Sequence, residues 1–462
     1  MSFDDHLNPI VVKEVRQGLR TRSFWIFFAL MLLACLVISL VAYAAQAQDE
    51  FDASGQWVFF AYFFCLGLVQ YFVIPYTAYR SLAREREDET WVLLVLTGLG
   101  PRRILLGKVG SFVTQAALYG SAAGPFLLFS YYLNGIDLPT ILVALVLGGV
   151  FQGFLTAMAV CAATLAEQPI TRGLMHFAVL GALLMATSYG LGLAFALVAE
   201  GNMVLASGFP LSVAAGLWLL LSYGALLFEA AAARLSLSTE GYAHGVRGVF
   251  AVQLLVSAGI VLFAWFDGGR SGDAPQVAQA VFCVHLSLIG LFVASDVDGM
   301  ASRFRSKTRF FSVFKPGALR GFRLVLSALV TSTGLWATLY LASNGDVSDH
   351  QFLTLLAEGA YAALYLSAPF LLSRALPWPS LRTPTATRLL FVATLLAGAG
   401  LPPLVGAIAA GEPGLTCSTT SPLSTPTSSL QSSSTGVSCA PATELKPSGR
   451  GARLHASGAT GG

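Results

Sequence analysis

Long apolar runs separated by short polar segments fill most of the chain. A helix needs about 20 apolar residues to cross a bilayer, because each residue advances it by about 1.5 Å. Such runs lie near residues 24–45, 57–78, 111–133, 139–164, 174–198, 211–232, 249–266, 277–295, 322–342, 352–373 and 388–410. Uninterrupted runs of this length favour helices, whereas barrel strands would alternate over about ten residues. The pattern therefore predicts an all-α, polytopic helical membrane protein with about 11 transmembrane helices.

Composition agrees with this fold class. Hydrophobic residues make up 55% of the chain and charged residues only 11%, with a mean hydropathy of +0.70. Soluble domains carry about 25% charged residues, so the composition excludes a chain built only of soluble domains. The six cysteines form no CxxC pair and no Cys/His cluster. Neither a metal site nor a redox pair is therefore predicted.

The basic residues predict the orientation. With the N-terminus inside, the cytoplasmic segments before residue 411 carry 23 Lys and Arg residues, and the outer loops carry one, Arg270. Positively charged loops stay in the cytoplasm, so we expect a cytoplasmic N-terminus.

Residues 411–462 differ from the rest of the chain. Ser and Thr supply 19 of these 52 residues, and large apolar side chains are scarce. Such a segment cannot offset the entropy lost on folding, so a disordered C-terminal tail is predicted. An odd number of spans would place this tail outside, so a twelfth span remains an open alternative.

The segment 8–22 has the pattern of a short interfacial helix. Asn8 suits the N-cap and Pro9 the first helical position. Apolar and basic positions then fall on different faces: Val11, Val15 and Leu19 on one, Lys13, Arg16 and Arg20 on the others. This predicts a helix along the cytoplasmic membrane surface, although a basic flank of the first span would look similar.

A longer cytoplasmic loop, residues 80–108, joins the second and third expected spans. Alternating charges at 84–89 precede a six-residue apolar stretch at 91–96, and Gly98 to Pro101 predict a turn. The apolar stretch is too short to cross a bilayer and too apolar to lie free in water. We expect it to pack against the helix bundle or against a cytoplasmic partner.

Two segments, NPIVVKEVRQGLRTRSF and ETWVLLVLTGLGPRRILLGK, resemble ABC-2 type permeases, the transmembrane subunits of bacterial ABC transporters. The resemblance is clearest over residues 8–135, and it implies that the chain lies in a bacterial inner membrane. It implies an amphipathic connecting helix before the first span, and a coupling helix in the 80–108 loop that contacts the ATP-binding subunit. The residues that it assigns to this contact are Glu85, Glu87, Asp88, Glu89, Thr90, Trp91, Leu94, Arg102, Arg103 and Lys108. Among these, Arg102, Arg103 and Lys108 would orient the third span at the membrane surface.

The resemblance divides the chain into three parts. Residues 1–232 would form a permease half with the amphipathic helix and six spans, and residues 233–410 carry five further spans that fit a degenerate second half. Residues 411–462 are the tail. The resemblance implies a homo- or hetero-dimer of permease subunits, but a chain of this length could also supply both halves itself.

No nucleotide-binding or catalytic motif is found in the sequence. Residues 100–108 lack P-loop spacing, and Val109 stands where a magnesium-binding Ser or Thr would be needed. ATP and magnesium would therefore be bound by a partner subunit; this chain is expected to be no enzyme, to hold no cofactor and to bind no nucleic acid.

Ionisable residues inside spans are candidates for function. Glu358 and His285 are the two candidates here, although either could simply bond within the bundle. The leading hypothesis is the permease subunit of an ATP-driven exporter with an unidentified substrate. The alternatives are an ion-coupled secondary transporter that uses Glu358, or a membrane anchor or assembly protein without transport.

Overall fold

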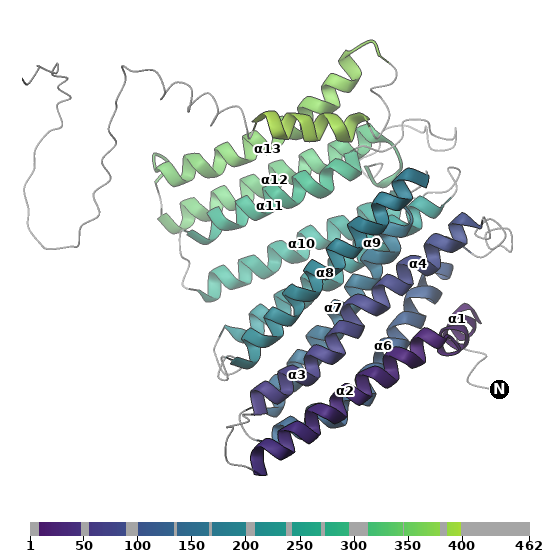
Figure 1. Ribbon diagram of the computed structural model, residues 1–462. Coiled ribbons are helices and arrows are strands. Elements are labelled where there is room, and N and C mark those ends of the chain that lie inside the picture. The colour runs from purple at the N-terminus through teal and green to yellow at the C-terminus, as the bar shows by residue number, and fades with distance from the viewer. Residues whose placement is uncertain are drawn as a thin grey trace, which may run out of the picture. The chain divides into compact units, whose positions relative to one another are not determined.

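A computed structural model shows the chain as a bundle of long helices (Figure 1). The structure describes these residues: 9–47, 55–88, 100–133, 136–165, 169–199, 208–236, 243–268, 273–294, 313–344, 346–378 and 386–398. In these ranges the regular structure is helical throughout, which confirms the all-α fold class.

The helices are bounded as follows: α1 Pro9–Leu19, α2 Arg22–Ala47, α3 Gly55–Gly67, the π-helix η2 Leu68–Val73, α4 Ile74–Glu87, α6 Pro101–Tyr132, α7 Leu138–Ala163, α8 Pro169–Ala199, α9 Phe209–Leu235, α10 Ala243–Asp267, α11 Asp273–Ala294, α12 Ala318–Asn344 and α13 His350–Ala375. A shorter apolar helix covers Ala386–Gly398. Proline stands in the first turn of α4, α6, α7 and α9, where its missing N–H has no helical partner to lose.

Ten helical segments are long and apolar enough to cross a membrane, counted over the described residues. They coincide with the first ten predicted spans, and α3, η2 and α4 together form the second. The eleventh predicted span is described only as Ala386–Gly398, so its full length stays a prediction. The predicted tail, 411–462, lies outside the described residues.

Buried apolar side chains gather in separate clusters. The largest extends from Phe24 to Leu235 and joins the helices up to α9. Two smaller clusters lie among the later helices, one centred on Phe250 and Val325 and one on Trp336. α9 belongs to both sets, because it packs on α7 and on α10. The predicted boundary at residue 232 falls inside α9, and the division into two permease halves stays a prediction.

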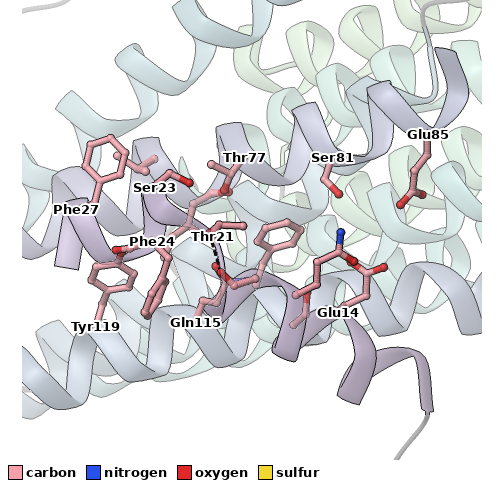
Figure 2. Close-up of a pocket in the computed structure, with 16 residues that line it drawn as sticks. Glu14, Thr21, Ser23, Phe24, Phe27, Thr77, Ser81, Glu85, Gln115 and Tyr119 are labelled. Carbon is pink, nitrogen blue, oxygen red and sulfur yellow. Dashed lines mark hydrogen bonds between the residues drawn. The ribbon is translucent and has the colours of Figure 1, made fainter. Parts of the chain in front are cut away.

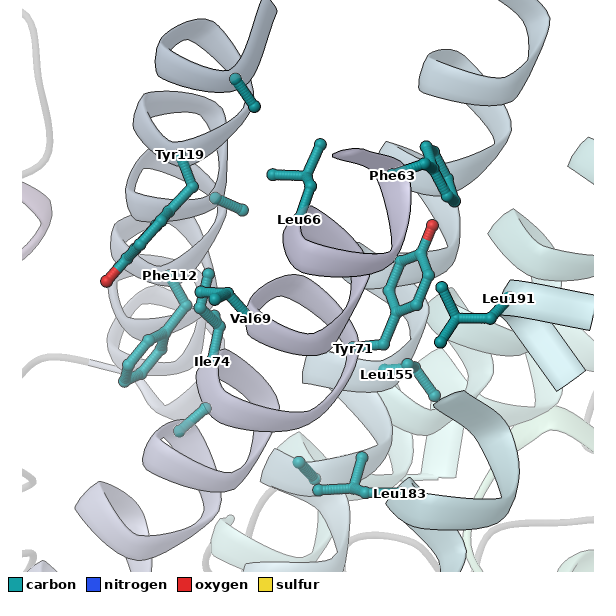
Figure 3. Close-up of a cluster of buried hydrophobic side chains, with 14 of the residues drawn as sticks. Phe63, Leu66, Val69, Tyr71, Ile74, Phe112, Tyr119, Leu155, Leu183 and Leu191 are labelled. Carbon is teal, nitrogen blue, oxygen red and sulfur yellow. The ribbon is translucent and has the colours of Figure 1, made fainter. Parts of the chain in front are cut away.

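The second span contains a π-helical turn at Leu68–Val73. Tyr71, on this turn, is buried among Phe63, Leu155 and Leu191 (Figure 3). Its ring and hydroxyl fit only because glycines face them: a Cβ added at Gly148 would lie 2.6 Å from the Tyr71 hydroxyl. A π turn accommodates one extra residue in a helix and is frequently found at functional sites. The second span is therefore not a uniform α-helix.

Candidate functional site at the N-terminal helix

The short helix α1 packs along the first turns of α6. Val11 faces Gly110, a Cβ at Gly18 would meet the Gln115 side chain, and Leu19 joins the large apolar cluster. Lys13, Arg16 and Arg20 are exposed. The predicted amphipathic helix is therefore present, and its apolar face covers α6. Its position relative to the membrane surface stays a prediction.

Lys108 of α6 is the centre of a buried ion cluster. Its side chain is 1% exposed, and its Nζ lies 2.6 Å from Glu85 Oε1 of α4 and 3.5 Å from Glu14 Oε2 of α1. The same Nζ donates a hydrogen bond to the Ser81 hydroxyl at 3.2 Å. Charge is costly to bury unless it is paired and hydrogen-bonded. This Lys108 ion cluster therefore ties three helices together at one end of the bundle.

The end of α4, which leads into the 80–108 loop, contacts two more helices. Arg86 Nη1 donates a hydrogen bond to the Ala163 carbonyl of α7 at 3.2 Å. Glu87 Oε1 lies 4.0 Å from Arg172 Nη1 of α8, and both side chains are partly exposed. The end of α4 therefore contacts α6, α7 and α8, and Lys108 links it to α1.

The start of α6 is tied to the later helices. Arg102 donates from Nε at 3.0 Å and from Nη2 at 2.7 Å to Glu229 Oε2 of α9. Gly245, in the first turn of α10, packs so closely that an added Cβ would overlap both side chains. Arg102, Glu229 and Gly245 thus form a three-helix junction beside the same loop.

A cavity of about 180 Å³ lies next to the Lys108 ion cluster (Figure 2). Its walls come from α1, the start of α2, α4 and α6. Glu14, Glu85 and Gln115 supply polar groups, while Phe24 and Phe112 supply apolar walls. The cavity therefore combines an ionic end with an aromatic one.

Polar stripes on three helices build this cavity. The stripes are Glu14 and Gln17 on α1, continued by Thr21 between α1 and α2; Thr77, Ser81 and Glu85 on α4; and Lys108, Ser111 and Gln115 on α6. In each stripe the residues are three or four apart, which places them on one helix face. This spacing is visible in the sequence and could have indicated the site. Of these residues, the resemblance assigns only Lys108 and Glu85 to a site, the expected contact with an ATP-binding subunit.

The residues predicted to contact an ATP-binding subunit are only partly placed by the structure. Glu87, Asp88, Arg102 and Arg103 are exposed. Lys108 differs, because its ammonium group is covered by its two carboxylate partners and does not reach a surface. Glu89, Thr90, Trp91 and Leu94 lie outside the described residues.

The two intramembrane candidates lie on different helices. His285 of α11 shares a 2.5 Å hydrogen bond between Nδ1 and the Tyr223 hydroxyl of α9, and its ring stacks on Phe250. Glu358 of α13 precedes Gly359, which packs against Thr333 and Gln279. Glu358 Oε2 is buried without a hydrogen bond to any described residue. The structure shows no hydrogen bond between these two candidates among the residues that it describes.

The fold and this site define a multi-pass helical membrane protein with a buried ion cluster under an N-terminal helix. No group of three or more His, Cys, Asp or Glu side chains suited to a metal ion occurs within the described ranges. No family model, curated protein or solved structure matches the chain.

Proposed function

We propose that the chain is the membrane-spanning permease subunit of an ATP-driven ABC transporter of the ABC-2 type, acting as an exporter. The proposal rests on the resemblance of residues 8–24 and 89–108, and on one structural observation. The loop that would contact the ATP-binding subunit joins the bundle where α1, α4 and α6 meet at the Lys108 ion cluster.

This arrangement suits the transmission of force. Closure of an ATP-bound partner would press on the loop, and the load would pass into α4 through Glu85 and into α6 through Lys108. The Arg102–Glu229 contact would carry it on to α9. Packed helices held by ion pairs move as rigid units, which is what rocking between inward and outward states requires.

The test is co-purification of the full chain with an ATPase subunit from native membranes. Reversing the charge of Glu87, Asp88 and Glu89 to Lys should abolish this association and the stimulation of ATPase activity. The matched control reverses Asp137, Asp267 and Asp273, three exposed acids that border loops predicted to lie on the outer side of the membrane. Unchanged association in the loop variant would refute the contact.

The ion-coupled transporter is the second candidate, favoured by the buried Glu358 Oε2, which bonds to no residue in the described part of the chain. Proton-coupled uptake that is lost in Glu358→Gln, with no ATPase subunit co-purifying, would favour this alternative over the permease. Co-purification without any transport would favour an anchor or assembly role.

A further inference from the structure

We propose that the cavity beside the Lys108 ion cluster binds a primary ammonium group carried by a small polar headgroup. The site shares Glu85 with the residues that would contact an ATP-binding subunit, but the argument for it does not depend on the proposed function. It rests on the charge of the cavity, on its hydrogen-bonding groups and on its size.

The charged residues that line the cavity are acidic. They are Glu14 and Glu85, among the residues that the structure describes, and the ammonium group of Lys108 lies behind them. Lys108 is bonded closely to Glu85, at 2.6 Å, and reaches Glu14 only at 3.5 Å. Glu14 therefore retains the capacity to bind a second cation from the cavity side.

The hydroxyl groups of the lining face the cavity as acceptors. Thr77 donates its proton to the Ile74 carbonyl at 2.7 Å, and Ser111 donates to the Lys108 carbonyl at 2.8 Å. Thr21 donates to the Gly18 carbonyl at 2.7 Å. A hydroxyl that has given its proton to its own helix can only accept from a ligand. The lining thus offers carboxylate and hydroxyl acceptors to a ligand rich in N–H donors.

Gln115 gives independent evidence of a ligand. It is 8% exposed and lines the cavity, yet its amide makes no hydrogen bond to any residue that the structure describes. Buried amides are nearly always hydrogen-bonded, so an amide in this position needs a partner from inside the cavity. An amide oxygen in the cavity wall is a suitable acceptor for an ammonium proton.

The size and walls of the cavity favour an organic cation over a bare metal ion. Its volume of about 180 Å³ equals the liquid volume of about six waters. Phe24, Phe27 and Phe112 face it, and aromatic rings attract ammonium groups. A primary ammonium offers three N–H donors to these acceptors, whereas a trimethylated ammonium offers none.

Two sources could supply this group: the headgroup of a membrane lipid or a soluble amine. The experiment separates them with the full chain. Native mass spectrometry would measure lipid retained from nanodiscs that contain equal amounts of dioleoylphosphatidylethanolamine and dioleoylphosphatidylcholine. A second arm would measure the thermal stabilisation of the chain in maltoside micelles by ethanolamine and by choline.

The wild-type chain should retain the ethanolamine lipid over the choline lipid, or be stabilised by ethanolamine and not by choline. Glu14→Gln keeps the Lys108–Glu85 contact and should weaken this binding about tenfold or more, the loss of one charge-assisted hydrogen bond. Asp137→Asn, a carboxylate change at the N-cap of α7, should leave the preference unchanged.

Gln115→Met, which changes no charge, should also weaken the binding, and it decides the question if Glu14→Gln does not fold. A preference in the lipid arm alone assigns the site to lipid, and one in the micelle arm alone assigns it to a soluble amine. The proposal is overturned if neither arm distinguishes primary from trimethylated ammonium, or if both cavity variants bind like Asp137→Asn.

Discussion

Two buried cations in this protein are stabilised in different ways. Lys108 is paired with carboxylates from two other helices. Arg247, 2% exposed at the start of α10, instead donates to backbone carbonyls: Nη1 to Val313 at 2.7 Å and Nη2 to Gly317 at 3.0 Å. In the first arrangement the carboxylates neutralise the charge of the Lys108 ammonium group, so removing one partner leaves a buried charge without its counter-ion. The second anchors the chain just before α12 through backbone carbonyls.

At the residue scale, we predict that Lys108→Met lowers the free energy of unfolding by about 3–5 kcal/mol, because two carboxylates then lose their cation. Unfolding in mixed micelles followed by circular dichroism measures the change. Lys13→Met, at an exposed position of α1, is the control and should have little effect. Adding Glu14→Gln and Glu85→Gln to Lys108→Met should recover part of the loss. If the triple variant is no more stable than the single one, charge burial is not the cause.

At the scale of elements, the packing of the second span depends on glycines in its neighbours. Gly148 of α7 leaves room for the Tyr71 hydroxyl, and Gly190 of α8 leaves 3.2 Å between its would-be Cβ and the Tyr71 ring. Close approach through small residues is how helices pack in membranes, where water does not drive association. Here the small residues accommodate a bulky ring on a π turn.

Gly148→Val should therefore destabilise the protein by about 1–3 kcal/mol through overpacking. Gly149→Val is the matched control, since a Cβ there meets nothing within 4 Å. The same micelle unfolding assay compares the two. Gly148→Ala should also lower the free energy of unfolding, because its Cβ meets the Tyr71 hydroxyl. Adding Tyr71→Phe removes this hydroxyl and should restore part of the lost stability. Equal stability of the two valine variants would contradict this packing.

The sequence predicts the spans well and the cavity poorly. Ten apolar runs became ten helices, because backbone groups in a bilayer leave few alternatives to a helix. The sequence does not predict that Lys108 is buried and paired. Beside Arg102 and Arg103 it has the pattern of a basic residue at the membrane surface, and its partner Glu14 is far away in sequence. The π turn at Leu68–Val73 was not expected either, because one extra residue leaves the hydropathy of the run unchanged.

At the scale of the whole molecule, the three-helix junction of Arg102, Glu229 and Gly245 links the first six spans to the later ones. It lies outside the large apolar cluster, whose last member is Leu235. Polar contacts thus supplement apolar packing at the end of the bundle where the 80–108 loop returns. The junction gives that loop a direct connection to α9 and α10.

We predict that Arg102→Glu destabilises the chain and that adding Glu229→Arg restores at least half of the loss. The coupling energy should be about 1 kcal/mol, since Arg102 is largely exposed while Glu229 is mostly covered. A double-mutant cycle in the micelle assay measures it. Gly245→Val should break the same contact, whereas Gly248→Val faces open space and should not. Additive effects of the two charge reversals would show that the pair is not coupled.

The π turn also sets the rotational phase of everything that follows it in the second span. Each residue of an α-helix turns the chain by about 100° and advances it by about 1.5 Å. Removing the extra residue at Leu68–Val73 would rotate α4 by about that angle relative to α3. Ser81 and Glu85 would then point away from Lys108, whose ammonium they now hold. The extra residue lies two to three helical turns before Ser81 and Glu85. It thus determines which face of α4 is turned toward α6, and hence whether Glu85 can reach Lys108.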